Sequence, residues 1–326
     1  MSARFSFVVP VFNEQETLPE LQARLAAVMD SLDGPCEAIV VDDGSSDGTY
    51  PMLLRIHGDD PRFKVVRLTR NFGHQVAITA GLDLASGEAV IIMDGDLQDP
   101  PEVAGELIAR WQEGYEIVYG VRQDRSVESR WKRALGAAYY RVLRALTDIE
   151  IPVDTGDFRL VDRKALSAFQ TLREQHRYVR GMFAWVGFSQ IGVPYIREKR
   201  HAGETKYPLR KQLRLAGDGV VSFSNTPLRV ALFAGFVVSC AAFVFGAVAI
   251  GLKLFGYQGL SPGWTSLVVI VSFLAGIQLL VLGTLGLYVA SISDEVKRRP
   301  LYLVRDAYGF DSLPAVHPPR YETDRN

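Results

Sequence analysis

The chain has 326 residues and a formal net charge of −1, and 22% of its residues are charged while 48% are hydrophobic. Without a basic excess, a nucleic-acid partner is not expected. The two cysteines, Cys36 and Cys240, lie in segments of different character, so neither a disulfide framework nor a cysteine-based metal site is expected.

Strand and helix patterns alternate along residues 1–120 at the spacing of a parallel α/β sheet. We expect strands at Phe5–Val11, Ala38–Val41, Lys64–Leu68, Ala89–Met93 and Glu116–Tyr119. Amphipathic segments between them predict helices near Glu14–Leu32, Thr49–His57, Gly73–Ala85 and Glu102–Glu113. Ligands of open α/β sheets bind beyond the carboxyl ends of the strands, so we expect the functional site at that edge.

The second half of the chain changes character. Residues 126–146 predict a basic helix, and Asp154–Val161 predicts another strand. Tyr207–Val221 is amphipathic and basic, which favours a helix lying in a membrane interface over a solvated helix.

Two long uncharged stretches, near 229–252 and 266–291, predict two membrane-spanning helices, because about 20 helical residues cross a bilayer. Positive residues precede the first stretch and follow the second, at Arg210, Lys211, Arg214, Arg229 and Lys297–Arg299. We therefore expect both termini to be cytoplasmic, and the N-terminal sequence does not predict a signal peptide.

An acidic motif, Asp94-Gly95-Asp96-Leu97-Gln98-Asp99, directly follows the apolar run Ala89–Met93. Two carboxylates spaced i, i+2 after a buried strand suit Mg²⁺ or Mn²⁺, which prefer oxygen ligands. A simple polar turn is the alternative. We expect Asp99 to cap the next helix.

A second polar segment, Asp42–Thr49, follows another predicted strand. It matches neither the dinucleotide-binding fingerprint nor the P-loop, so hydride transfer has no motif support. Its Asp43 carboxylate is placed to accept hydrogen bonds from a nucleobase or ribose.

Together with Val9–Glu14, these two segments resemble the inverting family 2 glycosyltransferases, which have the GT-A fold. Arg70–Gly73, Thr155–Leu160 and Arg200–Lys206 are similar to the polyprenyl-phosphate members of that family. This group contains the dolichol-phosphate mannose synthases and the GtrB-type bactoprenol glucosyltransferases. The two predicted spans and the segment Glu295–Val304 resemble the GtrB type most.

The resemblance implies a nucleotide-sugar donor held by Pro10, Phe12, Glu14, Val41, Asp43, Asp94 and Gly95. It implies that Asp96 and Gln98, together with Asp94, ligate Mg²⁺ or Mn²⁺ at the donor diphosphate. Gly95 stands where alanine is frequent in the family, and Phe12 stands where tyrosine is frequent.

The acceptor in this group is a polyprenyl phosphate, which is mostly dianionic at pH 7 by analogy with phosphoserine. Basic residues expected to bind the acceptor or the diphosphate are Arg122, Arg125, Arg130, Arg200 and Lys206.

Asp157 occupies the position of the family's catalytic base, and Asp96 is expected to act with it. Because the nucleophile is already ionised, we hypothesise that Asp157 contributes mainly position and electrostatics. His74, His176 and His201 lack the spacing of a metal cluster, so we expect them to be non-catalytic.

These expectations divide the chain into a GT-A domain (1–206), an interfacial helix (207–228), a two-helix membrane region (229–293) and a cytoplasmic tail (294–326).

The leading reaction is transfer of glucose from UDP-glucose to undecaprenyl phosphate. Mannose from a GDP donor, and an aminosugar or aminoarabinose from a UDP donor, are alternatives. A processive synthase is disfavoured, because Val127 stands where its Gln-x-x-Arg-Trp motif needs glutamine. A non-enzymatic membrane subunit is a further alternative. Small residues at Gly276, Gly283 and Gly286 permit close helix packing, including between copies of the chain.

Overall fold

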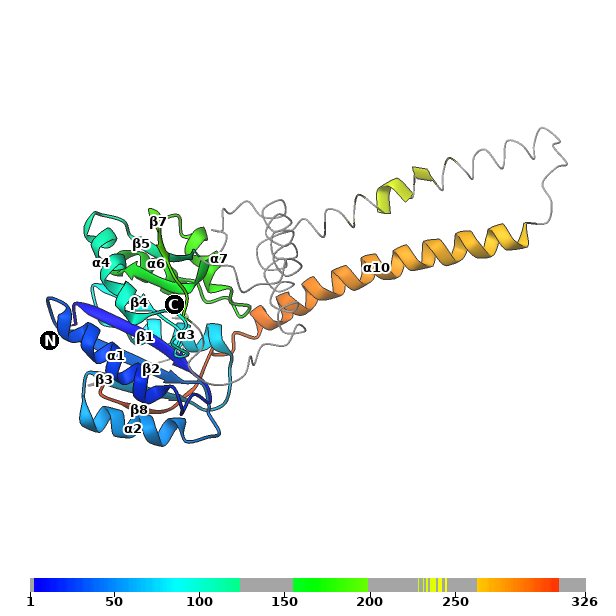
Figure 1. Cartoon of the computed structure of the whole chain (residues 1–326). Coiled ribbons are helices and arrows are strands. Elements are labelled where there is room, and N and C mark those ends of the chain that lie inside the picture. Colours follow the sequence, from blue (N-terminus) through cyan, green and yellow to red (C-terminus); the bar gives the residue numbers. More distant parts are fainter. Residues whose placement is uncertain are drawn as a thin grey trace, which may run out of the picture.

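The computed structural model describes residues 3–123, 155–198 and 263–310, together with scattered positions between 228 and 244 (Figure 1). Its centre is a sheet of eight strands in the order β7-β5-β6-β4-β1-β2-β3-β8. Four parallel strands form one half of the sheet: β1 (Phe5–Val11), β2 (Cys36–Asp42), β3 (Phe63–Leu68) and β4 (Ala89–Ile92). All four are expected from the sequence.

Helices connect these strands, as the alternating pattern predicts. They are α1 (Leu18–Ser31), α2 (Thr49–Asp59), α3 (His74–Leu84), and a short 3₁₀ turn η1 (Pro101–Val103) that leads into α4 (Ala104–Gln112). Side chains alternate across β1: Phe5, Phe7 and Val9 belong to one buried cluster, and Val8 belongs to the other. Both faces are therefore covered, which explains the nearly continuous apolar strand sequences.

The other half of the sheet is mixed. Its elements are β5 (Ile117–Arg122), β6 (Thr155–Asp162), α6 (Arg163–Thr171), α7 (Val179–Trp185) and β7 (Gln190–Tyr195). β6 lies between β4 and β5 and runs antiparallel to both, whereas β7 is parallel to β5. The sequence predicts β5 and β6, but it does not predict α6, α7 or β7.

A long helix, α10 (Trp264–Val296), extends away from the sheet domain (Figure 1). Its segment Phe273–Val296 has a mean hydropathy of 2.0, and none of it is buried. Among the described residues this is the one helix long and apolar enough to cross a membrane. It coincides with the second predicted span. The first predicted span falls mostly outside the described residues, as do the basic helix and the interfacial helix.

After α10 the chain returns to the sheet, where β8 (Val304–Tyr308) pairs antiparallel with β3. Tyr302 is 1% exposed, and its hydroxyl donates to Asp83 Oδ2 at 2.9 Å. The sequence pattern predicts a cytoplasmic C-terminal tail over 294–326. Within that range, β8 is an edge strand of the eight-stranded sheet.

Candidate functional site

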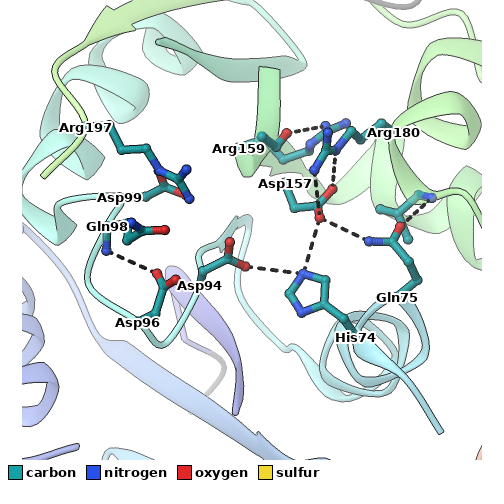
Figure 2. A network of polar contacts seen from close by, with 12 residues as sticks. His74, Gln75, Asp94, Asp96, Gln98, Asp99, Asp157, Arg159, Arg180 and Arg197 are labelled. Carbon is teal, nitrogen blue, oxygen red and sulfur yellow. Dashed lines mark hydrogen bonds and ion pairs between the residues drawn. The ribbon is translucent and has the colours of Figure 1, made fainter. Parts of the chain in front are cut away.

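Polar side chains from four elements meet at the carboxyl edge of the sheet (Figure 2). Asp94 follows β4, and Asp157 lies in β6. His74 and Gln75 form the first turn of α3, and Arg180 lies in the first turn of α7. The sequence motifs reveal the two carboxylates but not the other three residues.

The Asp157 carboxylate accepts hydrogen bonds from several side chains of this group. Arg180 Nε donates to Asp157 Oδ1 at 2.8 Å, and Arg180 Nη2 donates to Oδ2 at 3.3 Å. Gln75 Nε2 donates to the same Oδ2 at 3.0 Å. Burial alone would raise the pKa of Asp157, but Arg180 and His74 outweigh it and hold that pKa well below its ordinary value. A carboxylate held in this way is a poor proton acceptor.

His74 joins Asp157 to the acidic motif. Its Nε2 lies 3.3 Å from Asp157 Oδ2 and 3.3 Å from Asp94 Oδ1. Burial lowers the pKa of His74, but the charges of Asp94 and Asp157 outweigh that effect and raise the pKa well above its ordinary value. The structure therefore places His74 between two of the expected site residues. The expectation that His74 is non-catalytic rested on spacing between histidines, whereas His74 pairs with carboxylates distant in sequence. Its position directly after Arg70–Gly73 was the available signal.

Asp94, Asp96 and Gln98 lie on the loop that follows β4 (Figure 2). Asp96 Oδ1 accepts a hydrogen bond from the backbone N–H of Gln98 at 3.1 Å. Asp94 Oδ1 is buried without a hydrogen-bond donor, although His74 is near it. Two carboxylates and an amide oxygen fit a hard divalent ion that takes its remaining ligands from a diphosphate. In the described part of the chain, no three His, Cys, Asp or Glu side chains converge as a complete metal site.

Gly95 allows this loop to pack tightly on β1. A Cβ atom at Gly95 would lie 2.7 Å from Val11 Cγ1 and 3.3 Å from the Pro10 carbonyl oxygen. The departure from the family's frequent alanine therefore has a steric reason in this chain: Val11 fills the space that an alanine methyl would need.

Asp99 is not a helix cap, contrary to our expectation. It is fully buried, it accepts a hydrogen bond from the Tyr195 hydroxyl, and Arg197 Nε lies 3.5 Å from its Oδ1. Burial raises the pKa of Asp99.

Arg122 Nε donates to the same Tyr195 hydroxyl at 3.4 Å. Of the five basic residues that the resemblance selects, Arg122 is described; Arg125, Arg130, Arg200 and Lys206 lie outside the described residues.

Five of the expected donor-binding residues lie in or just after the ends of β1 and β2. Pro10 and Val41 are buried within the sheet, while Phe12 is 36% exposed. The backbone N–H of Glu14 donates to Thr49 Oγ1 at 2.9 Å and so joins the loops after the two strands. Asp43 is buried and accepts the backbone N–H groups of Phe72 at 2.7 Å and Gly73 at 2.9 Å. Burial raises the pKa of Asp43 to about 6.

Several known proteins are similar to this chain. The sequence profile of "Glycosyl transferase family 2" matches residues 6–169. An uncharacterized glycosyltransferase of Bacillus subtilis (strain 168), YkcC, is 47% identical over 95% of both chains. The bactoprenol glucosyl transferase of Shigella phage SfII is 38% identical, covering 94% of this chain and 98% of that protein. Glucosyl-3-phosphoglycerate synthase of Mycobacterium tuberculosis, solved with Mn²⁺ and UDP, is 20% identical with a TM-score of 0.46, covering 67% of this chain and 78% of that structure.

The chain belongs to glycosyltransferase family 2. It is a glycosyltransferase with the GT-A fold, and its sheet is mixed and mostly parallel.

Proposed function

We propose that this protein transfers glucose from UDP-glucose to a polyprenyl phosphate, with inversion, at the cytoplasmic face of a membrane. Similarity to a phage bactoprenol glucosyl transferase over 94% of the chain supports the sugar and the lipid acceptor. The observation that carries the proposal is the contact of His74 with both Asp94 and Asp157, at 3.3 Å each. Through His74, the acidic loop that is suited to a metal–diphosphate complex is connected to the Asp157 carboxylate, which has cationic side chains around it.

The donor side of the site is built from the loops after β1, β2 and β4. Phe12 offers an exposed ring on which the base would stack, and Asp43 holds the 70–73 segment, which would lie beside the nucleotide. Asp94, Asp96 and Gln98 would hold Mg²⁺ or Mn²⁺, and Asp94 and Gly95 would approach the ribose. When bound, the metal supplies positive charge that stabilises the departing diphosphate.

In the proposed reaction, an oxygen of the lipid phosphate forms a bond to the anomeric carbon of glucose. The bond from that carbon to the diphosphate breaks, and UDP leaves with the electron pair. The acceptor is mostly dianionic at pH 7, so little deprotonation is required. Arg122, with the undescribed Arg125, Arg130, Arg200 and Lys206, would bind the phosphate. Asp157 would orient Arg180 and His74 toward the charges that develop.

The membrane arrangement that we propose has two spans, near 229–252 and 266–291, with both termini cytoplasmic. The apolar segment Phe273–Val296 of α10 supports the second span. The return of the chain to β3 through β8 also supports a cytoplasmic C-terminus, because β8 belongs to the same sheet as the proposed site.

A donor panel tests this proposal. Membranes containing the protein are incubated with undecaprenyl phosphate, Mg²⁺ or Mn²⁺, and labelled UDP-glucose, GDP-mannose or UDP-aminosugars, and Asp96→Ala serves as the inactive control. We expect a lipid-linked sugar from UDP-glucose alone. If a lipid-linked sugar forms from another donor instead, the sugar of that donor is the one transferred, and the assignment of glucose is wrong. Absence of lipid-linked sugar from every donor would favour a non-enzymatic membrane subunit.

A further inference from the structure

The side chain of Gln75 connects two elements of the site at once. Its Nε2 donates to Asp157 Oδ2 on β6 at 3.0 Å. Its Oε1 accepts the backbone N–H of Val179, the first residue of α7, at 2.9 Å. Gln75 itself lies in the first turn of α3, next to His74 (Figure 2).

The two partners fix which way this amide points. Asp157 is ionised and offers acceptors only, whereas the Val179 N–H is a donor only. A reversed amide would place an oxygen against the carboxylate and an NH₂ group against the N–H. Both contacts would be repulsive, so Gln75 has one satisfied orientation.

The residue after Val179 is Arg180, whose guanidinium pairs with Asp157 from another side, with Nε at 2.8 Å from Oδ1. Gln75 therefore holds both the carboxylate and the start of the helix that carries its arginine. From these contacts we infer that Gln75 is a positioning residue for the transfer reaction. It sets the distance and angle between Asp157 and Arg180, and it does so without touching substrate. This inference rests on the proposed function, because it assumes that Asp157 acts in sugar transfer.

Two other glutamines hold the same helices through hydrogen bonds to backbone carbonyl groups. Gln170 Nε2 donates to the Leu82 carbonyl near the end of α3 at 2.8 Å. Gln190 Nε2 donates to the Phe183 carbonyl in α7 at 2.9 Å. Replacing either one removes a comparable hydrogen bond from α3 or α7, so these residues are matched controls for general loosening of the helices.

The first test compares Gln75→Ala with Gln170→Ala and Gln190→Ala in the full-length protein, using UDP-glucose and undecaprenyl phosphate. We expect kcat of Gln75→Ala to fall about 10–100-fold, the size typical of lost supporting hydrogen bonds at reactive groups. KM for UDP-glucose is expected to change little, because the donor-binding loops are not altered. The two controls are expected to lower the melting temperature while retaining kcat.

The second test uses Gln75→Glu, which keeps the side-chain shape. It places a carboxylate beside Asp157, within a group that also contains His74, Arg180 and Asp94. Two such carboxylates can share a proton at lower pH. We therefore expect the ratio of variant to wild-type kcat to rise as the pH falls from about 8 to about 6. A merely structural role predicts a ratio that does not change with pH.

The inference is overturned if Gln75→Ala and Gln75→Glu keep kcat, or lose it only as much as controls of equal thermal stability. A variant too unstable to assay is replaced by Gln75→Met, for which the same kcat loss is expected. If the wild type transfers glucose and the Gln75 variants keep its kcat, only this inference is overturned and the proposed function stands. A wild type that transfers no sugar from any donor overturns the proposed function and this inference together.

Discussion

At the scale of single residues, the ionisation state of Asp157 distinguishes a role as general base from an electrostatic role. A general base must take up a proton during the reaction, whereas Asp157 is held ionised by Arg180, His74 and Gln75. Because the pKa of Asp157 lies well below its ordinary value, proton uptake there is unfavourable. The structure thus favours the electrostatic role that the ionised acceptor already suggested.

Asp157→Asn separates these roles. Asparagine keeps the shape but removes the charge that Arg180 and His74 face. We expect kcat to fall roughly 100–1000-fold, as for other lost electrostatic contacts in active sites. The loss should be constant between about pH 6 and pH 8, because the wild-type carboxylate stays ionised throughout that range. If the loss follows the ionisation of the acceptor phosphate, Asp157 is a base; kcat–pH profiles of both proteins decide.

If Asp43 helps to hold the donor, as we propose, donor binding is expected to depend on pH. Its pKa is raised by burial to about 6, so the carboxylate is ionised above that pH and protonated below it. Protonation converts one acceptor oxygen to a hydroxyl and weakens the hold on the Phe72 and Gly73 N–H groups. We expect the affinity for UDP-glucose to decrease as the pH falls through about 6. Calorimetric titration without acceptor checks this, because the phosphate of the lipid is then absent. In Asp43→Asn this transition should disappear, and its persistence would assign it to another group.

At the scale of elements, the sequence predicts the strands and helices with the strongest periodicity. β1 to β4 are apolar runs covered on both faces, and α1 to α4 are amphipathic, so local patterns are sufficient. α7 has seven residues and β7 contains both Gly192 and Pro194, so neither gives a clear period. β8 was missed because its strand character depends on pairing with β3, which is more than 200 residues away in sequence.

The residues of the candidate site divide in the same way. Asp94, Asp96 and Asp157 lie in motifs that a sequence alone can reveal. His74, Gln75 and Arg180 have no motif of their own, and their roles depend on contacts over 20 or more residues. Asp99 was misassigned because capping was inferred from the adjacent turn, whereas burial against Tyr195 determines its environment.

The return segment between α10 and β8 gives a prediction on stability. Tyr302 donates to Asp83 at the end of α3, and Arg173 Nη1 lies 2.9 Å from the same Asp83 Oδ2. Tyr302→Phe removes the hydroxyl bond and is expected to cost about 1 kcal/mol in free energy of unfolding. Tyr302→Ala also empties a buried ring position and is expected to cost about 3–5 kcal/mol. Thermal unfolding in detergent measures both. Equal melting temperatures for wild type and Tyr302→Ala would show that this segment does not stabilise the domain.

At the scale of the whole molecule, the proposed site lies on the same sheet to which the chain returns after its apolar helix. α10 extends from the sheet domain, and β8 brings the chain back to β3 (Figure 1). In the membrane arrangement that we propose, this path would keep the nucleotide site attached to a membrane on which a lipid acceptor is presented. It is consistent with a reaction that joins a water-soluble donor to a membrane-bound acceptor.

Removal of the divalent ion tests the donor half of this arrangement. We expect EDTA to abolish transfer and to weaken UDP-glucose binding at least about 10-fold, because the diphosphate then faces Asp94 and Asp96 without a bridging cation. Mg²⁺ or Mn²⁺ should restore binding to the wild type but not to Asp96→Ala. Metal-independent binding of UDP-glucose would contradict the assignment of the acidic loop.

The most direct test of the central claim uses purified protein in vesicles that contain undecaprenyl phosphate. After addition of UDP-glucose and Mg²⁺, the released UDP and the glucose on lipid are quantified, and the anomeric configuration is determined by NMR. The account predicts one UDP for each lipid-linked glucose, with a β linkage formed from the α-linked donor. UDP release that does not depend on the lipid, or an α-linked product, would contradict it.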